Sequence, residues 1–373
     1  MKNKNALILI TVVALIIVAI AFLQSRKIAV NVSEISSAAE IDIPELSIAE
    51  KDAKYDKARE ITDPAGFINT PPFTLKDVIG KKVILLDIWT YSCINCQRTL
   101  PYITAWNEKY KDEGLLIVGI HSPEFEFEKN IDNVHAAVEQ FGVTYPVVLD
   151  NNFGTWHAYR NNYWPRKYLI DIDGYVVYDH IGEGGYEETE NKIKELLAER
   201  AQKLGETVDL QSDVTSSITV EDAITDTYPR SPETYFGAMR NSTFGNGTQG
   251  AVGGFELTMP SNILKNMFYL DGSWNIHEEY AENATKNAHL IYRYSGDKVY
   301  MVAHAETGAS IQILQDGKPV TIDAGADVDE TGRVHIQNEK LYKIINNADG
   351  AGEHTLEIIF ETPGVQIFTF TFG

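Results

Sequence analysis

The chain has 373 residues, of which 44% are hydrophobic and 10% aromatic, and its formal net charge is −21. This length and hydrophobic content predict two folded domains with connecting segments and exclude a disordered protein. The negative charge argues against binding to nucleic acid and against docking on anionic lipid through a basic surface.

The first predicted element is an apolar segment near the N-terminus. Residues 6–23 read ALILITVVALIIVAIAFL, with Thr11 as their one polar residue. A helix of this length spans about 27 Å, close to the hydrocarbon thickness of a bilayer. We therefore predict a signal anchor over residues 1–27, which leaves a membrane-anchored protein with extracytoplasmic domains. A cleaved and secreted form is the alternative, because Ala19 and Ala21 satisfy the small-residue rule for signal cleavage.

The next segments alternate between linkers and folded units. Residues 28–66 are polar, acidic and short of core signals, which predicts a stalk. Residues 67–204 alternate buried strands with amphipathic helices, which predicts an α/β domain. Residues 205–230 are polar and rich in Ser, Thr and Asp, as expected for a second linker.

The periodicity changes in residues 231–373. Short runs of β-forming residues are separated by Gly, Asp and Asn turns, and Phe368, Phe370 and Phe372 alternate at period two, as in a half-buried strand. This pattern predicts an all-β sandwich of jelly-roll-like type after the α/β domain.

The only two cysteines of the sequence, Cys93 and Cys96, follow the apolar run VILLDIW. Where such a pair begins a helix, the free N–H groups and the positive end of the helix dipole lower the pKa of the first thiol. The second sulfur then lies one turn further along the same helix face. This arrangement suits thiol–disulfide exchange, with Cys93 as the attacking thiol and Cys96 as the resolving thiol.

Three other uses of the cysteines are less favoured. A zinc site needs about four ligands, and the sequence has no second C-x-x-C. A structural disulfide of this spacing closes too short a loop to stabilise the fold much. A redoxin-type peroxidase would carry Pro or Thr five residues before its reactive cysteine, whereas Thr90 is three residues before Cys93. We expect no metal and no cofactor besides the redox-active Cys93–Cys96 disulfide.

The motif DIWTYSCINCQRTLPY at residues 87–102 resembles the active site of thioredoxin-fold proteins, specifically of the DipZ-like and TlpA-like redoxins. Later segments follow in family order: GIHSPEFEFEKN, YPVVLD, NNYWPRKYLIDIDG and GEGGYEE, then SPETYFG, LDGSW and the terminal FTFG. The resemblance implies a thioredoxin fold over residues 67–204. It also implies that the β-sandwich over residues 231–373 is carbohydrate-binding-like.

The resemblance assigns roles to single residues. Asp87 matches the buried acid of thioredoxins, in which burial raises the pKa and the carboxylate accepts the proton of the resolving Cys96. Pro165 matches the cis-proline that faces the two sulfurs. Three supporting positions match the tryptophan beside the dithiol, the residue before the cis-proline and the proline that bends the active-site helix: Trp89, Trp164 and Pro101.

Two polar residues, His121 and Glu124, end a predicted strand on the side where ligands bind in such sheets. A proton shuttle is one interpretation of Glu124. We favour a helix-capping role, because Ser122 and Pro123 create a helix N-terminal environment beside it.

The preferred function is that of an exported, membrane-tethered thiol–disulfide oxidoreductase that reduces or exchanges protein disulfides, with the direction of electron flow left open. DipZ-type relatives carry a multi-helix membrane domain, which one apolar segment replaces here, so the expected electron donor is a separate CcdA- or DsbD-like membrane protein. The alternative from another class is a surface protein that binds cell-envelope glycan and carries a passenger redox domain. It predicts exposed aromatic side chains for sugar stacking: Trp274, Tyr235 and Tyr342.

Overall fold

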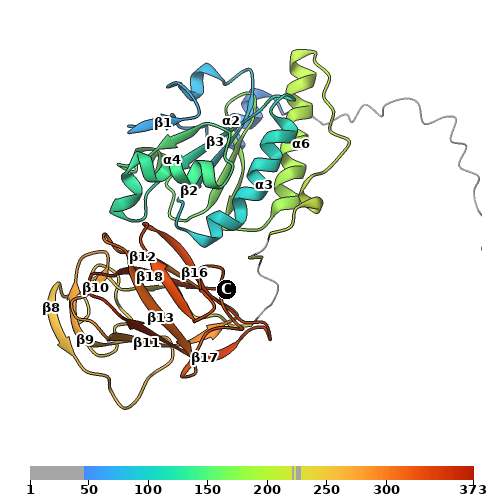
Figure 1. Cartoon of the computed structure of the whole chain (residues 1–373). Helices are drawn as coiled ribbons and strands as arrows, with labels where there is room; N and C mark the ends of the chain where they lie inside the picture. The colour runs from blue at the N-terminus through green and yellow to red at the C-terminus, as the bar shows by residue number, and fades with distance from the viewer. Residues whose placement is uncertain (1–45, 221, 224–227) are drawn as a thin grey trace, which may run out of the picture. The chain divides into compact units, whose positions relative to one another are not determined.

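The computed structural model describes residues 46–220, 222–223 and 228–373 (Figure 1). The predicted signal anchor, residues 1–27, lies outside the described residues. Among the residues that are described, no helix is both long and apolar enough to cross a membrane.

A six-stranded sheet forms the centre of the N-terminal domain, with the strand order β1-β4-β3-β2-β5-β6. Strands β2, β3 and β4 are parallel, whereas β1, β5 and β6 pair antiparallel to their neighbours. The strands are β1 (Gly66–Ile68), β2 (Val83–Trp89), β3 (Leu115–His121), β4 (Val147–Leu149), β5 (Arg166–Ile170) and β6 (Val176–Ile181).

Helices cover both faces of this sheet. Helices α3, α4 and α6, which Figure 1 labels, contribute side chains to one apolar core, and α5 contributes to the core on the opposite face. The alternation of strands and helices predicted for residues 67–204 is confirmed. The helices are α2 (Ile48–Lys54), η2 (Leu75–Asp77), α3 (Ile94–Tyr110), η3 (Glu126–Lys129), α4 (Ile131–Gln140), α5 (Gly154–Ala158), α6 (Tyr186–Leu204) and η4 (Thr215–Ser217).

Strand β2 explains how the fold positions the predicted acid. All seven of its residues are buried, because it lies between β3 and β5 and has a core on each face. Side chains of a strand alternate between the two faces, so Leu85 and Trp89 enter the core on the α3 side, and Leu86 enters the other core. The same alternation places Asp87 on the α3 side, beneath the start of the helix that carries the cysteines.

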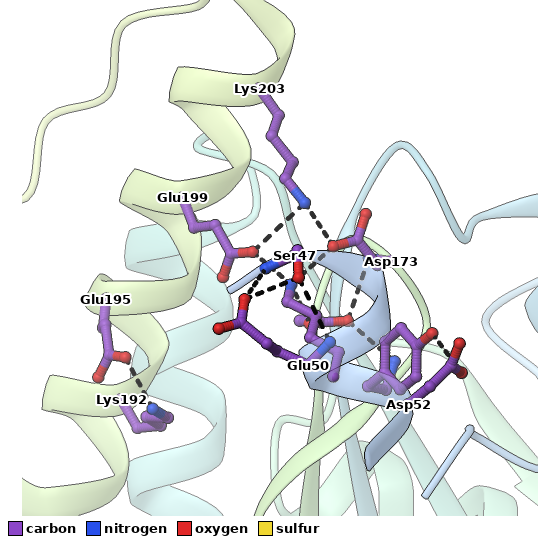
Figure 2. Close-up of polar contacts among 11 residues, drawn as sticks. Ser47, Glu50, Asp52, Asp173, Lys192, Glu195, Glu199 and Lys203 are labelled. Carbon is purple, nitrogen blue, oxygen red and sulfur yellow. Dashed lines mark hydrogen bonds and ion pairs between the residues drawn. The ribbon is translucent and has the colours of Figure 1, made fainter. Parts of the chain in front are cut away.

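The folded domain begins before residue 67. Helix α2 packs through Lys51, whose Nζ lies 2.6 Å from Asp171 Oδ2, 2.6 Å from Asp173 Oδ2 and 2.5 Å from Glu199 Oε1. Figure 2 shows Asp173 and Glu199 of this group beside the helix that carries Glu50. Strand β1 pairs with β4 and extends the sheet. Residues 46–66, which the sequence analysis places in a stalk, therefore contact the domain, because carboxylates 120 or more positions later in the sequence hold Lys51.

Replacing Lys51 by methionine should destabilise the N-terminal domain by about 3–5 kcal/mol, because three carboxylates would lose their shared buried partner. Although burial opposes the charge, hydrogen bonds to the carboxylates raise the pKa of Lys51, so this stabilisation is present at neutral pH and is lost only in strong alkali. Urea unfolding followed by tryptophan fluorescence measures the effect. The matched control is Lys54→Met, an exposed position on α2; equal stabilities of the two variants would contradict the prediction.

Part of the predicted linker also belongs to the folded structure. Glu190 in α6 accepts hydrogen bonds from the backbone N–H groups of Val214 and Thr215 at 2.8 and 2.9 Å. Trp106 in α3 donates from Nε1 to Thr215 Oγ1 at 3.0 Å. Residues 214 and 215 are therefore held against α3 and α6.

The C-terminal domain contains strands and turns only, within its described residues. Nine of its twelve described strands form one continuous path, β14-β13-β17-β11-β9-β10-β18-β12-β16, and the other three, β15, β7 and β8, pair with strands of this path. All strand pairs are antiparallel. The strands are β7 (Thr234–Tyr235), β8 (Gly253–Leu257), β9 (Phe268–Ile276), β10 (Ala281–Asn283), β11 (Ala288–Gly296), β12 (Lys298–His304), β13 (Ala309–Gln315), β14 (Lys318–Pro319), β15 (Arg333–Ile336), β16 (Lys340–Asn346), β17 (Gly352–Phe360) and β18 (Gln366–Phe372).

The path bends at β9, which belongs to two sheets. Its first residues, Phe268 to Asp271, pair with β11, and its last residues pair with β8 and β10. Gly272 lies at the change of partner with φ of +93°, a conformation that favours glycine. The bend brings the two halves of the path face to face around one apolar core, which confirms the predicted β architecture.

The aromatic side chains that would mark a sugar-stacking surface are mostly in this core. Trp274 has no exposed surface, and Tyr342 is 2% exposed. Tyr235 is partly buried and donates its hydroxyl to Glu124 of the N-terminal domain. The exposure that the glycan-binding alternative predicts is therefore not found at Trp274 or Tyr342, because the facing sheets enclose both rings.

Candidate redox-active site

Cys93 lies where β2 gives way to α3. It is the N-cap residue of α3, with extended backbone angles, and its carbonyl accepts the first helical hydrogen bond, from Gln97 N–H at 3.0 Å. Its side chain is only partly buried and lines a cavity of about 640 Å³. The predicted position of the attacking thiol, exposed at a helix N-terminus, agrees with this geometry.

Cys96 lies one turn further into α3 and is 1% exposed. Burial and the neighbouring Cys93 thiol, with which it is hydrogen-bonded, raise the pKa of Cys96 well above the usual value. The charge of Asp87 also acts to raise it. A thiol in this setting needs a base nearby before it can act as a nucleophile.

Asp87 is a buried carboxylate whose charge acts on Cys96. It is 1% exposed, and its Oδ1 has no hydrogen-bond partner among the described residues. Burial raises the pKa of Asp87 to about 7, although the positive charge of Lys167 acts in the opposite direction. A carboxylate with this pKa can accept and release a proton near neutral pH.

Lys167 is a site residue that the sequence analysis missed. It lies directly opposite Asp87 in the β2–β5 pairing and has no exposed surface, and its Nζ donates to the carbonyl of Gly182 at 3.2 Å. Burial lowers the pKa of Lys167, whereas the charges of Asp87 and Cys96 act to raise it. The signal in the sequence is a lysine, preceded by Arg166, directly before the apolar run YLI. Only the strand register shows that this lysine lies opposite Asp87.

The indole of Trp89 lies against Gly119 of the neighbouring strand β3. A side chain at Gly119 would come within 2.9 Å of Trp89 Nε1, so the ring occupies the place that a Cβ would need. The ring also makes an edge contact with His121, 5.2 Å between centroids. Burial lowers the pKa of His121 to about 3, so this imidazole is neutral at physiological pH and serves packing in this arrangement.

The described residues include both predicted prolines. The peptide bond between Trp164 and Pro165 is cis. Trp164 donates from Nε1 to the carbonyl of Ser122 at 2.9 Å and lines the same cavity as Cys93. Pro101 lies inside α3.

Glu128 was also missed, although it contacts the residue before Cys93. It has no exposed surface, and its Oε1 accepts from Ser92 Oγ at 2.6 Å and from Ser92 N–H at 3.2 Å. Its other oxygen accepts from the backbone of Glu124 and Phe125. Glu128 therefore performs the capping role that the sequence analysis gave to Glu124, and it holds the turn that leads into the dithiol.

Glu124 instead binds the C-terminal domain. Its carboxylate, 8% exposed, accepts from Arg240 Nη1 at 2.7 Å and from the Tyr235 hydroxyl at 2.8 Å. The segment HSPEF gives no sign of these partners, because they lie more than a hundred residues later.

Comparison with known proteins agrees with this geometry. Residues 55–197 match the Redoxin family, and residues 231–373 match the family described as "Thioredoxin like C-terminal domain". The chain is 30% identical over 135 residues to the thiol–disulfide oxidoreductase ResA of Bacillus thuringiensis, covering 34% of this chain and 75% of ResA. The chain belongs to the thioredoxin-like redoxin family of thiol–disulfide oxidoreductases.

This redoxin also resembles larger proteins. It is 36% identical over 313 residues to protein DipZ of Mycobacterium tuberculosis, covering 83% of this chain and 41% of DipZ. It thus spans about two fifths of the length of that relative. Among solved structures, a thioredoxin-family thiol:disulfide interchange protein from Chlorobium tepidum matches at 20% identity with a TM-score of 0.34, covering 39% of this chain and 99% of that one. The similarity to ResA and the Redoxin match confirm the predicted family, and the described sheet with its helices agrees with the predicted thioredoxin fold.

Proposed function

We propose that this redoxin catalyses thiol–disulfide exchange through the Cys93–Cys96 pair. The observation that carries the proposal is that two sulfurs one helical turn apart differ in accessibility. Cys93 borders a cavity at the N-terminus of α3, while Cys96 is buried behind it on the Asp87 side. An accessible thiol can attack a substrate, and a hidden thiol can attack only what is attached to its neighbour.

The exchange has two steps. The Cys93 thiolate attacks one sulfur of a substrate disulfide, so the substrate S–S bond breaks, a mixed disulfide forms and the other substrate sulfur leaves as a thiolate. Cys96 then loses its proton and attacks the Cys93 sulfur, which releases the second substrate thiolate and closes the Cys93–Cys96 disulfide. Two electrons pass from the protein dithiol to the substrate, and the same steps run in reverse oxidise a substrate dithiol.

Asp87 is the proposed base for the second step. The raised pKa of Cys96 keeps that thiol protonated, whereas an Asp87 carboxylate with a pKa of about 7 is partly ionised at neutral pH. Asp87 takes the proton from Cys96 as the thiol attacks, and it returns the proton when the pair is reduced again. Lys167, opposite Asp87, favours the ionised form of that carboxylate.

The proposed partners follow from the same chemistry and from the family resemblance. Substrates are protein disulfides or dithiols outside the cytoplasm, and the apolar segment at residues 6–23 serves as the tether. When exchange runs in the reducing direction, a CcdA- or DsbD-like membrane protein supplies the electrons, and the tether raises the local concentration of the dithiol near that donor.

A redox titration tests the proposal. The full protein is equilibrated with mixtures of reduced and oxidised glutathione, and the state of Cys93 and Cys96 is read by alkylation and mass shift. We expect a reversible two-electron transition, and its midpoint tells a reductant from an oxidant. A pair that does not exchange with glutathione, or that reacts with hydrogen peroxide faster than with any disulfide, would refute the proposal and favour a peroxidase.

A further inference from the structure

The cavity over Cys93 has walls from both domains. The N-terminal domain supplies Cys93, Asn95 and Trp164, and the C-terminal half of the chain supplies Arg230, Glu233, Tyr235, Arg240 and Thr371. Thr371 lies on β18 between two buried phenylalanines, so its side chain faces away from the sandwich core. A strand of the β-sandwich therefore faces the reactive thiol across the cavity.

Paired side chains hold this wall in place. Beyond its bond to Glu124, the Arg240 guanidinium lies 3.6 Å from the centroid of the Tyr235 ring and 5.2 Å from that of Phe125. Two residues after Glu124, the backbone N–H of Glu126 at the start of η3 donates to Glu279 Oε2 of the sandwich at 2.9 Å. The Glu124 carboxylate is 8% exposed and accepts hydrogen bonds from Arg240 and Tyr235. It therefore links the two domains more strongly than a surface ion pair would, because water screens its charge little.

An apolar contact beside the dithiol supports the same wall. Ile94, directly after Cys93, is buried in a small cluster with Tyr300, Val302 and Phe368 of the sandwich. On α3, the buried Arg98 donates to the Tyr300 hydroxyl at 3.4 Å. The first turn of the active-site helix thus packs against the sandwich.

We propose that the substrate-binding site of the dithiol is shared by the two domains and that it accepts a disulfide carried on a short, extended peptide segment. The inference rests on the proposed function. A cavity of about 640 Å³ has the size of sites for small ligands and short segments. A rigid folded partner would need roughly 800 Å² of open surface around its sulfur, which the sandwich wall obstructs.

The lining fits a peptide better than a small hydrophobic disulfide. Asn95, Asn162 and Thr371 present amide and hydroxyl groups that can pair with a peptide backbone. Tyr163 and Tyr228, 50% and 41% exposed, border the cavity and offer ring surface to side chains next to the substrate cysteine. The sandwich is therefore assigned to substrate selection.

The test compares three probes that carry the same reporter, a cysteine in mixed disulfide with thionitrobenzoate. The cysteine is placed in an unstructured eight-residue peptide, on the surface of a compact folded protein, or in free N-acetylcysteine. Release of the coloured thiol gives kcat/KM for the full-length protein. We expect the peptide to exceed both other probes by about tenfold or more. A folded-protein probe or a free-cysteine probe that reacts as fast as the peptide overturns the proposal.

Two substitutions in the wall sharpen the test. Thr371→Trp fills the cavity from the sandwich side and should lower kcat/KM for the peptide about tenfold, mainly through KM, with the redox midpoint unchanged. Its control is Thr355→Trp, on an outward position of β17 away from the cavity. Arg240→Ala removes the link to Glu124 and should reduce the difference in kcat/KM between the peptide probe and the folded-protein probe. Its control is Arg293→Ala, which removes an exposed ion pair with Glu353 and should leave that difference unchanged.

The outcomes separate the two proposals. If the redox titration shows the expected transition, but kcat/KM for the probes is unchanged in Thr371→Trp and Arg240→Ala, the shared site is wrong. The exchange reaction is then still supported. A failed titration in the unmodified protein overturns the exchange reaction itself.

Discussion

Replacing Cys96 by serine should convert the protein into a trap that stops at the mixed disulfide. Cys93 remains at the cavity and still attacks, but the resolving sulfur is gone, so a covalent adduct accumulates and turnover falls to the background rate. Non-reducing gels of extracts that contain the variant should show adducts that disappear with dithiothreitol.

The Cys93→Ser variant is the matched control for this experiment. Its remaining thiol, Cys96, is buried and its pKa is raised, so it should form almost no adducts. Adducts formed through Cys96 in Cys93→Ser, and not through Cys93 in Cys96→Ser, would reverse the assignment of attacking and resolving thiols.

Replacing Asp87 by asparagine should slow catalysis and stabilise the fold at the same time. Loss of a general base typically costs roughly 10²-fold in rate, and the resolving step should carry that loss at pH 7. The effect on stability has the opposite sign, because the ionised carboxylate is buried with one oxygen lacking a partner among the described residues.

The pH dependence of that stabilisation follows from the pKa. Asp87 has a pKa of about 7 in the folded protein against 3.8 ordinarily, so above pH 4 the unfolded chain gives up this proton more readily than the folded one. Folding therefore loses stability as pH rises from 4 to 7, by about 4 kcal/mol in total. Asparagine does not titrate, so the variant should be more stable than the wild type at pH 8 and similar to it below pH 4.

Turnover and urea unfolding at several pH values measure both effects. Asp112→Asn, an exposed position after α3, is the matched control and should change neither quantity. Unchanged turnover of Asp87→Asn between pH 6 and 8 would show that water or another group takes the proton from Cys96. Unchanged stability at pH 8 would show that the Asp87 carboxylate is better solvated than its burial indicates.

The local pattern of the sequence was sufficient to find the dithiol and to order the elements around it. The apolar run before Cys93 forms β2, and the two-residue spacing places Cys96 one turn along α3, because an apolar run and the helical repeat are properties of residues adjacent in the chain. The family motif added Asp87, which is buried, and the Trp164–Pro165 pair, whose peptide bond is cis. The change of periodicity after residue 230 likewise predicted the all-β domain.

Only the tertiary structure showed what surrounds these residues. Lys167 faces Asp87 through strand register, Lys51 meets carboxylates 120 to 148 positions away, and Glu124 meets Arg240 116 positions away. Charged residues of this kind resemble solvated surface positions in the sequence, because neither their spacing nor their neighbours differ from those of exposed ones. Their partners are set by which elements pack together, and packing depends on the burial of apolar surface across the whole chain. For the same reason the sequence does not predict that residues of the β-sandwich, such as Thr371, line the cavity at Cys93.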